Sequence, residues 1–331
     1  MKNFSVSCRV LSVLLLSLFL LAFAGCGSKA ASGSSTPPPA KKLESIRMTY
    51  VKSPLNIPSI LEKKDKIFEN AFQADGTSIA YSDLDAGPKQ TEAMAAGKMD
   101  ICHALGGTSA ILAAANGIDL KIVGIYSRAP EAFMLMVKDS SIQSMQDLKG
   151  KTIAGPKGTI LHQLLLAALK KAGMQADDVQ FVSMGIPQAA AALAGGSADA
   201  ALLAGPATLK MQNEGCRVLT TGKGLLDATI VIAMRSDFIR DYPDAAKKFM
   251  DTHAQVVAGY AAKPESAYAA AAAETGLSEE QVRTMAKWYD FDPSIRAADI
   301  MDLEETQDFL VQTGMLEKDK KIDIKALCQT L

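Results

Sequence analysis

Two stretches of the sequence, 99 residues apart, follow one pattern and decide the predicted fold. Residues 88–106 read PKQTEAMAAGKMDICHALG, and residues 187–205 read PQAAAALAGGSADAALLAG. Each begins at a proline, ends a short helical run at a glycine, continues through an aspartate into an apolar strand, and closes with a second glycine. Because the prolines, glycines and aspartates keep the same register, we interpret the stretches as equivalent parts of two similar α/β lobes.

Strands and helices are expected to alternate on either side of these stretches, which predicts mostly parallel sheets covered by helices. The expected strands are residues 45–51, 78–81, 99–105, 120–126, 132–137, 152–155, 179–183, 198–203 and 228–234. The expected helices are residues 58–72, 91–96, 109–116, 159–172 and 188–193. From residue 242 the chain is expected to be helical, at 242–260, 264–275, 278–289 and 298–313, and to support the lobes rather than carry the site.

The first residues have the features of an export signal. Lys2 and Arg9 precede an apolar run that leads to Cys26. This order resembles the bacterial lipobox, in which the cysteine is lipidated, although Phe23 stands where leucine is usual. A transmembrane anchor is the alternative, but the run is shorter than the ~20 residues that a spanning helix needs. We therefore expect a signal peptide over residues 1–25, lipidation of Cys26, and a location outside the cytoplasm at a bacterial membrane. Residues 26–43, rich in Gly, Ser and Pro, are expected to form a linker from the lipid anchor.

Composition excludes several classes of function. The formal net charge is −1, so the chain lacks the excess of positive charge that binding to nucleic acid requires. Beyond Cys26 the chain has only Cys102, Cys216 and Cys328, which allow at most one disulfide. The three histidines are too widely spaced to suggest a metal site, and no serine-nucleophile, phosphate-loop or dinucleotide motif occurs. The expectation is a globular binding protein without cofactor or metal, not an enzyme.

Six short loops, each after a strand and before a helix, are the candidate ligand site. In open α/β sheets the carboxyl ends of the strands line the ligand crevice, and helix N-termini suit an oxyanion. A simple helix cap is the alternative for each loop taken alone. The candidate ligand residues on these loops are Ser53, Pro54, Asn56, Gly87, Pro88, Gly107, Thr108, Ser109, Gly158, Thr159, Met184, Gly185, Gly205 and Pro206.

Two further candidates carry a charge or can acquire one. His162 lies one turn into the helix that follows Thr159, where it either reaches a ligand anion or hydrogen-bonds locally. Arg128 is suited to a carboxylate or sulfonate, although a solvated arginine in a turn is the favoured alternative. Both are kept as candidate ligand residues.

Several segments carry a resemblance to a known family. They are residues 87–101 (GPKQTEAMAAGKMDI), 140–151 (SSIQSMQDLKGK), 157–162 (KGTILH), 196–200 (GSADA) and 235–244 (RSDFIRDYPD). From about Ile46 to its C-terminus the chain resembles the extracytoplasmic solute-binding proteins of ABC importers, in the group of aliphatic-sulfonate, taurine, nitrate and thiamine-pyrimidine binders. Residues 201–206 (ALLAGP) depart from the sulfonate-type members, which often carry a tryptophan there; the sole tryptophan, Trp288, lies among the C-terminal helices.

The resemblance implies a two-lobed periplasmic-binding-protein-like fold of type II, in which two doubly wound lobes are joined by two β crossovers at residues 133–137 and 230–234. The first lobe is expected over 44–134, the second over 135–230, and the return to the first lobe with the C-terminal helices over 231–331. It also implies a monomer that passes a small anionic or zwitterionic solute, with a sulfonate-like class favoured, to an ABC permease with a cytoplasmic ATPase. A receptor that signals to a membrane sensor, and a pyrimidine-synthase-like enzyme, are the alternatives.

Overall fold

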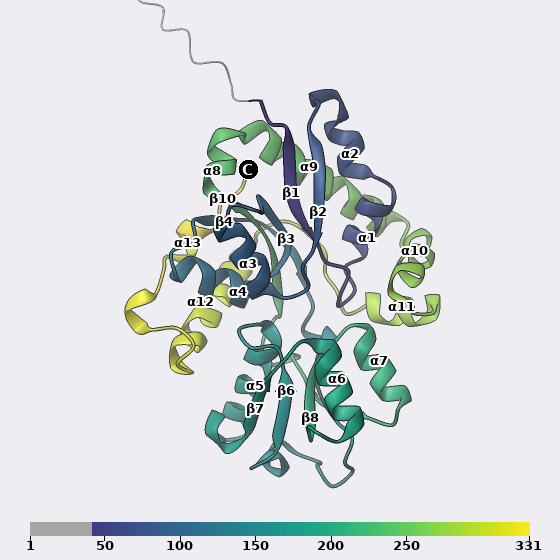
Figure 1. The fold of residues 1–331 in the computed structure, drawn as a ribbon, viewed down its shortest axis with the longest axis vertical. Coiled ribbons are helices and arrows are strands. Elements are labelled where there is room, and N and C mark those ends of the chain that lie inside the picture. Colours follow the sequence, from purple (N-terminus) through teal and green to yellow (C-terminus); the bar gives the residue numbers. More distant parts are fainter. Residues whose placement is uncertain (1–41) are drawn as a thin grey trace, which may run out of the picture. The chain divides into compact units, whose positions relative to one another are not determined.

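Two five-stranded sheets organise residues 42–331, which are the residues that the computed structural model describes (Figure 1). The expected signal peptide, Cys26 and nearly all of the expected linker lie outside these residues. Within residues 42–331, no helix has the combination of length and apolar character that crossing a membrane requires.

The first sheet has the strand order β2-β1-β3-β10-β4. Strands β1, β2 and β3 run parallel, and β10 lies antiparallel between β3 and β4. The bounds are β1 Ser45–Tyr50, β2 Ser78–Asp83, β3 Ile101–Gly106, β4 Leu120–Arg128 and β10 Thr229–Arg235.

The second sheet repeats this plan in the order β7-β6-β8-β5-β9. Strands β6, β7 and β8 are parallel, and β5 lies antiparallel between β8 and β9. The bounds are β5 Phe133–Val137, β6 Thr152–Gly155, β7 Gln180–Ser183, β8 Ala200–Ala204 and β9 Arg217–Thr221. Each sheet is therefore parallel except for one inserted strand, which confirms the predicted two-lobed α/β fold and the equivalence of the lobes.

The chain passes between the sheets twice. Residues 129–132 connect β4 of the first sheet to β5 of the second, and residues 222–228 connect β9 back to β10. The strands expected as crossovers, 133–137 and 230–234, each belong wholly to one sheet. The lobe boundaries expected after residues 134 and 230 fall inside β5 and β10, because each inserted strand pairs over its whole length with one lobe.

The repeated aspartates of the two sequence stretches have the same structural role. Asp100 Oδ2 accepts a hydrogen bond from the backbone N–H of Arg47 at 2.9 Å, and the Asp100 N–H donates back to the Arg47 carbonyl. Asp199 makes the same pair of bonds with Thr152. Each aspartate thus joins the beginning of its strand to the neighbouring parallel strand, so this part of the motif serves the fold rather than the ligand.

Thirteen helices cover the sheets of the described chain. Their bounds are α1 Ile57–Lys64, α2 Ile67–Phe72, α3 Gly87–Ala95, α4 Gly107–Ala115, α5 Ile160–Lys171, α6 Ile186–Gly195, α7 Pro206–Asn213, α8 Ser236–Asp241, α9 Pro243–Ala262, α10 Glu265–Thr275, α11 Glu279–Ala286, α12 Ala297–Gln312 and α13 Ile324–Leu327. The single helix expected over 58–72 is broken at Lys66, whose φ of 51° is left-handed. Helices α7, α8 and α13 and strand β9 were not predicted.

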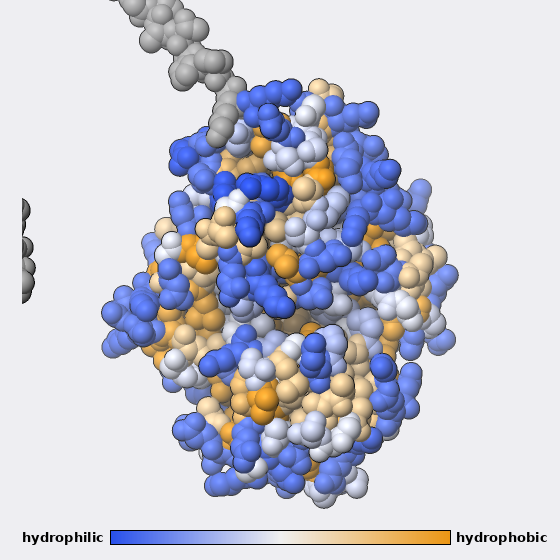
Figure 2. Space-filling model, viewed as in Figure 1, coloured by the Kyte–Doolittle hydropathy of each residue, from blue (hydrophilic) through white to orange (hydrophobic). Residues whose placement is uncertain are grey.

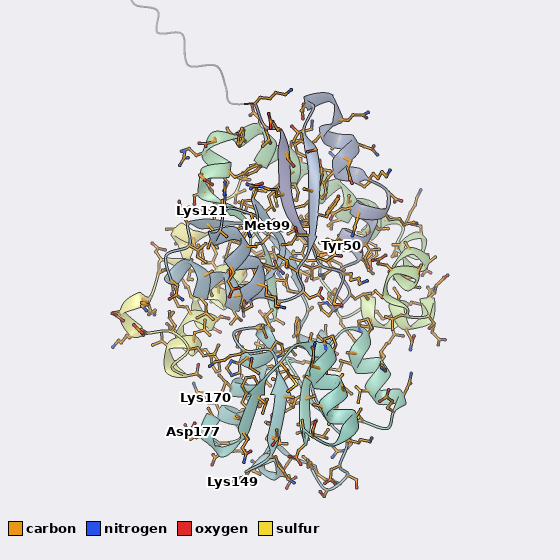
Figure 3. All side chains as sticks on the ribbon, viewed as in Figure 1. Tyr50, Met99, Lys121, Lys149, Lys170 and Asp177 are labelled. Atoms are coloured by element: carbon orange, nitrogen blue, oxygen red, sulfur yellow. The ribbon has the colours of Figure 1, made fainter. Side chains whose placement is uncertain are left out.

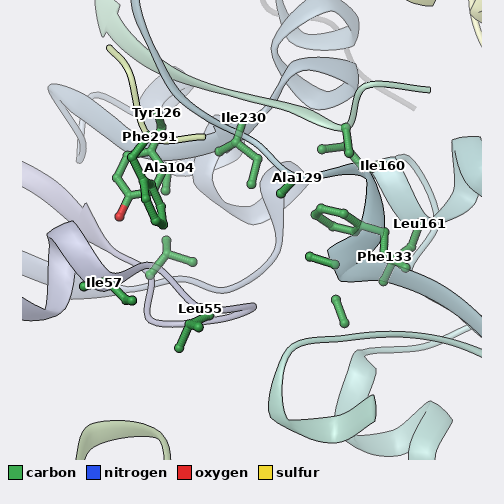
Figure 4. Close-up of a cluster of buried hydrophobic side chains, with 14 of the residues drawn as sticks. Leu55, Ile57, Ala104, Tyr126, Ala129, Phe133, Ile160, Leu161, Ile230 and Phe291 are labelled. Carbon is green, nitrogen blue, oxygen red and sulfur yellow. The ribbon is translucent and has the colours of Figure 1, made fainter. Parts of the chain in front are cut away.

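The core continues from one lobe into the other. One cluster of buried apolar side chains includes Ile46 and Tyr126 of the first lobe together with Leu135 and Leu164 of the second. Figure 4 shows Phe133, at the start of β5, beside Leu161 in this cluster. The three cysteines within residues 42–331 are free, and Cys102 and Cys216 are buried, as expected for small apolar side chains.

Candidate functional site

A cavity of about 720 Å3 lies between the loop edges of the two sheets. The space-filling view shows the surface hollowed where the two lobes meet (Figure 2). Both lobes contribute to its wall: Ser53, Asn56 and Ser109 come from the first, and Thr159 and Pro206 from the second. A volume of this size is typical of small-molecule sites, which span roughly 300–1,000 Å3.

The first turns of six helices converge on the cavity. Helices α1, α3, α4, α5 and α6 contribute their N-cap residues, which are Asn56, Ala86, Gly106, Thr159 and Gly185, and α7 contributes its first residue. None of these six helices has a side-chain cap on its N-terminal N–H groups. The first N–H groups of a helix have no partner within the helix and carry partial positive charge. The cavity therefore receives several helix N-termini with free donors.

The hydroxyl groups in the cavity wall are mostly engaged with the backbone. Ser109 Oγ donates to the Gly158 carbonyl at 2.8 Å, and Thr159 Oγ1 donates to the Pro156 carbonyl at 2.9 Å. Each of these oxygens can still accept a hydrogen bond, but its own proton is committed. Ser53 is half-buried, and its hydroxyl makes no hydrogen bond to the described residues. Of the three, Ser53 is the one with a proton to offer a ligand.

Two buried amides in the wall are also committed as donors. The Asn56 amide nitrogen donates to the carbonyls of Val51 and Ser53, at 2.9 and 3.1 Å. The Gln90 amide nitrogen donates to the carbonyls of Leu84 and Ala104, at 3.0 and 3.2 Å. Both N–H groups of each amide therefore donate to backbone carbonyls and hold a loop next to a strand end. Neither side chain has a donor left for an anion.

The remaining wall is apolar, with charge confined to the rim. Val51, Phe133, Ile160 and Ile230 are buried in it, and Phe133 supplies an aromatic wall that the sequence reasoning did not anticipate. The charged lining residues are all exposed. They are Asp83, Asp85, Lys89, Lys210 and Glu214. The described interior of the cavity therefore contains no charged side chain.

Half of the expected site residues line the cavity. These are Ser53, Pro54, Asn56, Gly87, Ser109, Thr159, Gly185 and Pro206. Gly107 and Thr108 instead line a separate cavity of about 10 Å3 beside the crossing segment, and Met184 packs against an apolar cluster of the second lobe. The Gly158 carbonyl is engaged by Ser109, and Pro88 lies against Gly158 across the junction.

Gly205 brings the backbones of the two lobes into contact. Its φ of 64° and ψ of −143° lie in a region that is essentially restricted to glycine. A Cβ atom built there would lie 2.2 Å from the carbonyl oxygen of Pro54 in the first lobe. Gly205 is therefore required by the approach of the lobes, a role that differs from a direct contact with ligand.

Arg128 requires a correction, because it lies outside the cavity with its guanidinium fully engaged. It donates to both carboxylate oxygens of Asp299 at 2.6 Å, to Asp290 at 3.3 Å, and to the carbonyls of Asp292 and Ser294 at 3.0 Å. These bonds use all five N–H groups of an arginine. Arg128 therefore fastens the end of β4 to the C-terminal region and has no donor left for a ligand.

His162 also lies outside the cavity wall. Its ring stacks on Phe181 with a centroid distance of 4.5 Å, which is neither of the two expected contacts. Burial, with a smaller effect from the charge of Lys157, lowers the pKa of His162 to about 4. The imidazole is therefore neutral near pH 7 and brings no positive charge to the site.

The structure joins two histidines that are far apart in the sequence. Glu62 of α1 lies between His103 of β3 and His253 of α9, with oxygen-to-nitrogen distances of 2.7 Å to each ring. The three side chains are at most 1% exposed, and their potential ligand atoms lie within 4.8 Å of one another. Sequence spacing did not suggest this cluster, because it assembles from three separate elements. We call it the Glu62 triad.

Comparison with known proteins agrees with this architecture. A family model described as "NMT1/THI5 like" matches residues 72–267. The putative aliphatic sulfonates-binding protein of Bacillus subtilis is 31% identical over 319 residues, which cover 95% of this chain and 92% of that protein. The taurine-binding periplasmic protein of Escherichia coli is 29% identical over 205 residues, 60% of this chain and 62% of that protein.

A solved structure shows the same fold. The alkanesulfonate-binding protein of Xanthomonas axonopodis pv. citri, bound to MOPS, superposes with a TM-score of 0.80 at 24% identity, over 88% of this chain and all of that one. Together with the family model, which spans more than half of the sequence, and the full-length relative, this leads to one conclusion: the chain belongs to the NMT1/THI5-like family.

Proposed function

We propose that this protein is an extracytoplasmic receptor that binds a small organic anion, with a sulfonate group favoured, in the cavity between its lobes. The observation that carries the proposal is the convergence of six uncapped helix N-termini on a cavity whose interior lacks charged side chains. Oriented N–H groups stabilise an oxyanion without the desolvation that a buried lysine or arginine would require. The names of the relatives support a sulfonate as the anionic group.

The anion is best placed between α4 and α5. Prolines in the first turns of α1, α3, α6 and α7 remove one N–H group from each of these helices. Helices α4 and α5 begin without proline, and the first turn of α4 meets the loop before α5 where Ser109 Oγ donates to the Gly158 carbonyl. An anion at this position would contact both lobes at once, so it would favour their closed arrangement by differential affinity.

The wider role follows from the family and from the sequence. We propose that the protein works as a monomer, that Cys26 is lipidated and holds it at the membrane surface, and that it delivers its solute to an ABC permease with a cytoplasmic ATPase. Binding rather than catalysis is the favoured activity, because the relatives are named as binding proteins. Delivery to a permease is testable separately from binding, by uptake of labelled solute in cells that carry or lack the gene.

The binding site can be tested with a backbone substitution. Ile160→Pro replaces the first residue of α5, where proline is tolerated, and removes one N–H group; Ile160→Ala is the matched control that trims the same side chain but keeps the N–H. Thr159 already has an extended conformation, which suits a residue before proline. Because a hydrogen bond to a charged group contributes about 1.5–3 kcal/mol, Ile160→Pro should bind butanesulfonate roughly 10- to 150-fold more weakly than Ile160→Ala.

The measurement is isothermal titration with butanesulfonate, taurine, butyrate and nitrate on residues 42–331. A sulfonate that binds should also raise the melting temperature by mass action. Equal affinity of the two Ile160 variants would place the anion elsewhere in the cavity. Lack of binding by every sulfonate, combined with binding of butyrate or nitrate, would contradict the favoured class of solute.

A further inference from the structure

Helices α5 and α12 form a seam between the two lobes, beside the ligand cavity, whose wall includes the first turn of α5. Helix α5 follows β6 of the second sheet, whereas α12 packs on α4 and β10 of the first lobe. Two side-chain bridges cross the seam. Gln163 of α5 meets Thr306 of α12, and seven residues later Lys170 donates to Gln312 at 2.5 Å. Figure 3 labels Lys170 on the second lobe.

Gln163 is the centre of the buried part of the seam. The Thr108 hydroxyl donates to its amide oxygen at 2.5 Å, and its amide nitrogen donates to the Thr306 hydroxyl at 3.1 Å. Gln163, Thr108 and Thr306 are 6%, 1% and 7% exposed. One side chain of the second lobe is thus inserted between two helices of the first. By contrast, Lys170 and Gln312 are exposed, and such a surface contact adds little.

The side chains of this bridge lie next to the ligand cavity but do not form its wall, and Ile160, three residues before Gln163, lines both cavities. Gln163, Thr108 and Thr306 are absent from the wall of the 720 Å3 cavity and line the small cavity of about 10 Å3 instead. That small cavity also contacts Ala228, at the end of the second crossing segment. Ala228 has a left-handed φ of 54°, an unfavourable conformation for alanine. The bridge therefore joins α5 of the second lobe to α4 and α12 of the first, so any opening motion that carries α5 away from these two helices has to break it.

We propose that Gln163 is a positioning residue whose bridge to Thr108 and Thr306 clasps the lobes together independently of the ligand. Rotation of the lobes would separate the three side chains and leave buried hydroxyl and amide groups without partners, which is unfavourable. The clasp therefore shifts the balance between open and closed lobes toward closure, and it changes affinity without touching the solute.

The first test measures the distance between the lobes without any ligand. Spin labels at Glu92→Cys on α3 and Gln212→Cys on α7, both exposed positions, report the separation in a Cys328→Ser background. Gln163→Leu keeps the approximate volume and removes both hydrogen bonds. The population with a longer distance should grow by about 5- to 150-fold, the factor that corresponds to two buried neutral hydrogen bonds.

Gln307→Leu is the matched control. Gln307 is the neighbour of Thr306 on α12, is 3% exposed, and makes two hydrogen bonds to the backbone of Ile322 within the first lobe. This variant should lower the melting temperature but leave the distance distribution unchanged. Equal distance distributions in Gln163→Leu, Gln307→Leu and the parent protein would overturn the proposal.

A second pair of variants keeps the test decisive if Gln163→Leu folds poorly. Thr306→Val removes the hydroxyl at nearly constant volume, and Thr306→Ser retains it. Thr306→Val should lengthen the distance, whereas Thr306→Ser should not; the same response from both would contradict the clasp. An affinity measurement with butanesulfonate rests on the proposed function. Thr306→Val should release butanesulfonate faster than the parent protein, with an unchanged association rate. If butanesulfonate binds to no variant, the proposed function fails, while the distance measurement still decides about the clasp.

Discussion

Replacement of Glu62 by glutamine is a stringent test of how the first lobe is held together. The Glu62 triad is buried to at least 99%, and its carboxylate accepts from two imidazoles at 2.7 Å. Breaking a buried hydrogen-bonded pair that includes a charge costs about 3–5 kcal/mol. Glutamine has similar volume but only one oxygen, so it cannot accept from both rings. We expect Glu62→Gln to lower the free energy of unfolding by about that amount, or the melting temperature by about 10 °C.

The pH dependence gives the sign of the effect. Burial alone would raise the pKa of Glu62, but His103 and His253, through their charge when protonated and through their hydrogen bonds, lower it to about 2. Burial in turn lowers the pKa of His103, so the hydrogen bonds to the carboxylate do not require a charged ring. A carboxyl group with a lowered pKa contributes stability above its ordinary value of 4.5, and this contribution is lost as the pH falls from 4.5 toward 2. The difference between parent and Glu62→Gln should therefore be full at pH 7 and should shrink at pH 3.

Urea unfolding followed by circular dichroism at pH 7 and pH 3 measures both quantities. Glu304→Gln is the matched control, because Glu304 is exposed on α12 and makes no ion pair with the described residues; its effect should stay within about 0.5 kcal/mol. A Glu62→Gln effect below about 1 kcal/mol, or a difference that grows on acidification, would refute the reasoning. The triad would then be a packed cluster without a charged hydrogen-bond network.

Three further predictions concern single residues. Burial raises the pKa of Asp302 to about 6, so ionisation of this carboxyl group lowers the free energy of unfolding as the pH rises from 4 through 6. In thermal melts, Asp302→Asn should therefore stabilise the protein at pH 8 by up to about 3 kcal/mol and change little at pH 4. Arg128→Met should lower the free energy of unfolding by about 3–5 kcal/mol, because it leaves Asp299 buried without its partner. The folded fraction should retain its order of preference among solutes in titration. A changed preference would show that Arg128 takes part in binding. Gly205→Ala should lower the melting temperature, because the backbone conformation is strained for alanine, and should also weaken butanesulfonate binding, because the added Cβ collides with Pro54 of the other lobe. Unchanged affinity would show that this contact is dispensable.

The sequence predicted the part of the fold that depends on local pattern. The Pro-Gly-Asp-Gly register identified the two lobes because glycine and proline punctuate helices and the aspartates bond to the neighbouring strand. The break at Lys66 was missed, since no glycine or proline marks it. The lobe boundaries were placed a few residues late, because the apolar pattern of β5 and β10 does not show which sheet each strand joins.

The candidate site was predictable at the level of loops, and less so at the level of side chains. The rule that strand ends and helix N-termini line the crevice selected Ser53, Asn56, Ser109 and Thr159. It failed for Arg128, whose acidic partners lie more than 160 residues later in the chain. Phe133 was recognised as part of a strand, but its place in the cavity wall depends on the junction of the two lobes.

The other missed wall residues show the same limit. Gln90 and Ala190 lie close to the start of α3 and α6, which begin at or directly after the expected residues Gly87 and Gly185, so extending each loop by one helical turn would have included them. Thr275, at the end of α10, reaches the cavity from the C-terminal third, which was expected only to support the lobes. Nothing in the local sequence of Thr275 indicates this position.

The insertion of β10 between β3 and β4 has a consequence for the order in which the polypeptide acquires its structure. Residues 133–221 contain every strand of the second sheet in one uninterrupted run, so this lobe can complete itself as soon as residue 221 is available. The first sheet has to wait for residues 229–235, and until they arrive the edges of β3 and β4 face each other across an unfilled gap. Unpaired strand edges are prone to association with other chains. A chain made from its N-terminus therefore leaves the edges of β3 and β4 unpaired while the whole second lobe is made, and protection by a chaperone would matter most for the lobe that is synthesised first.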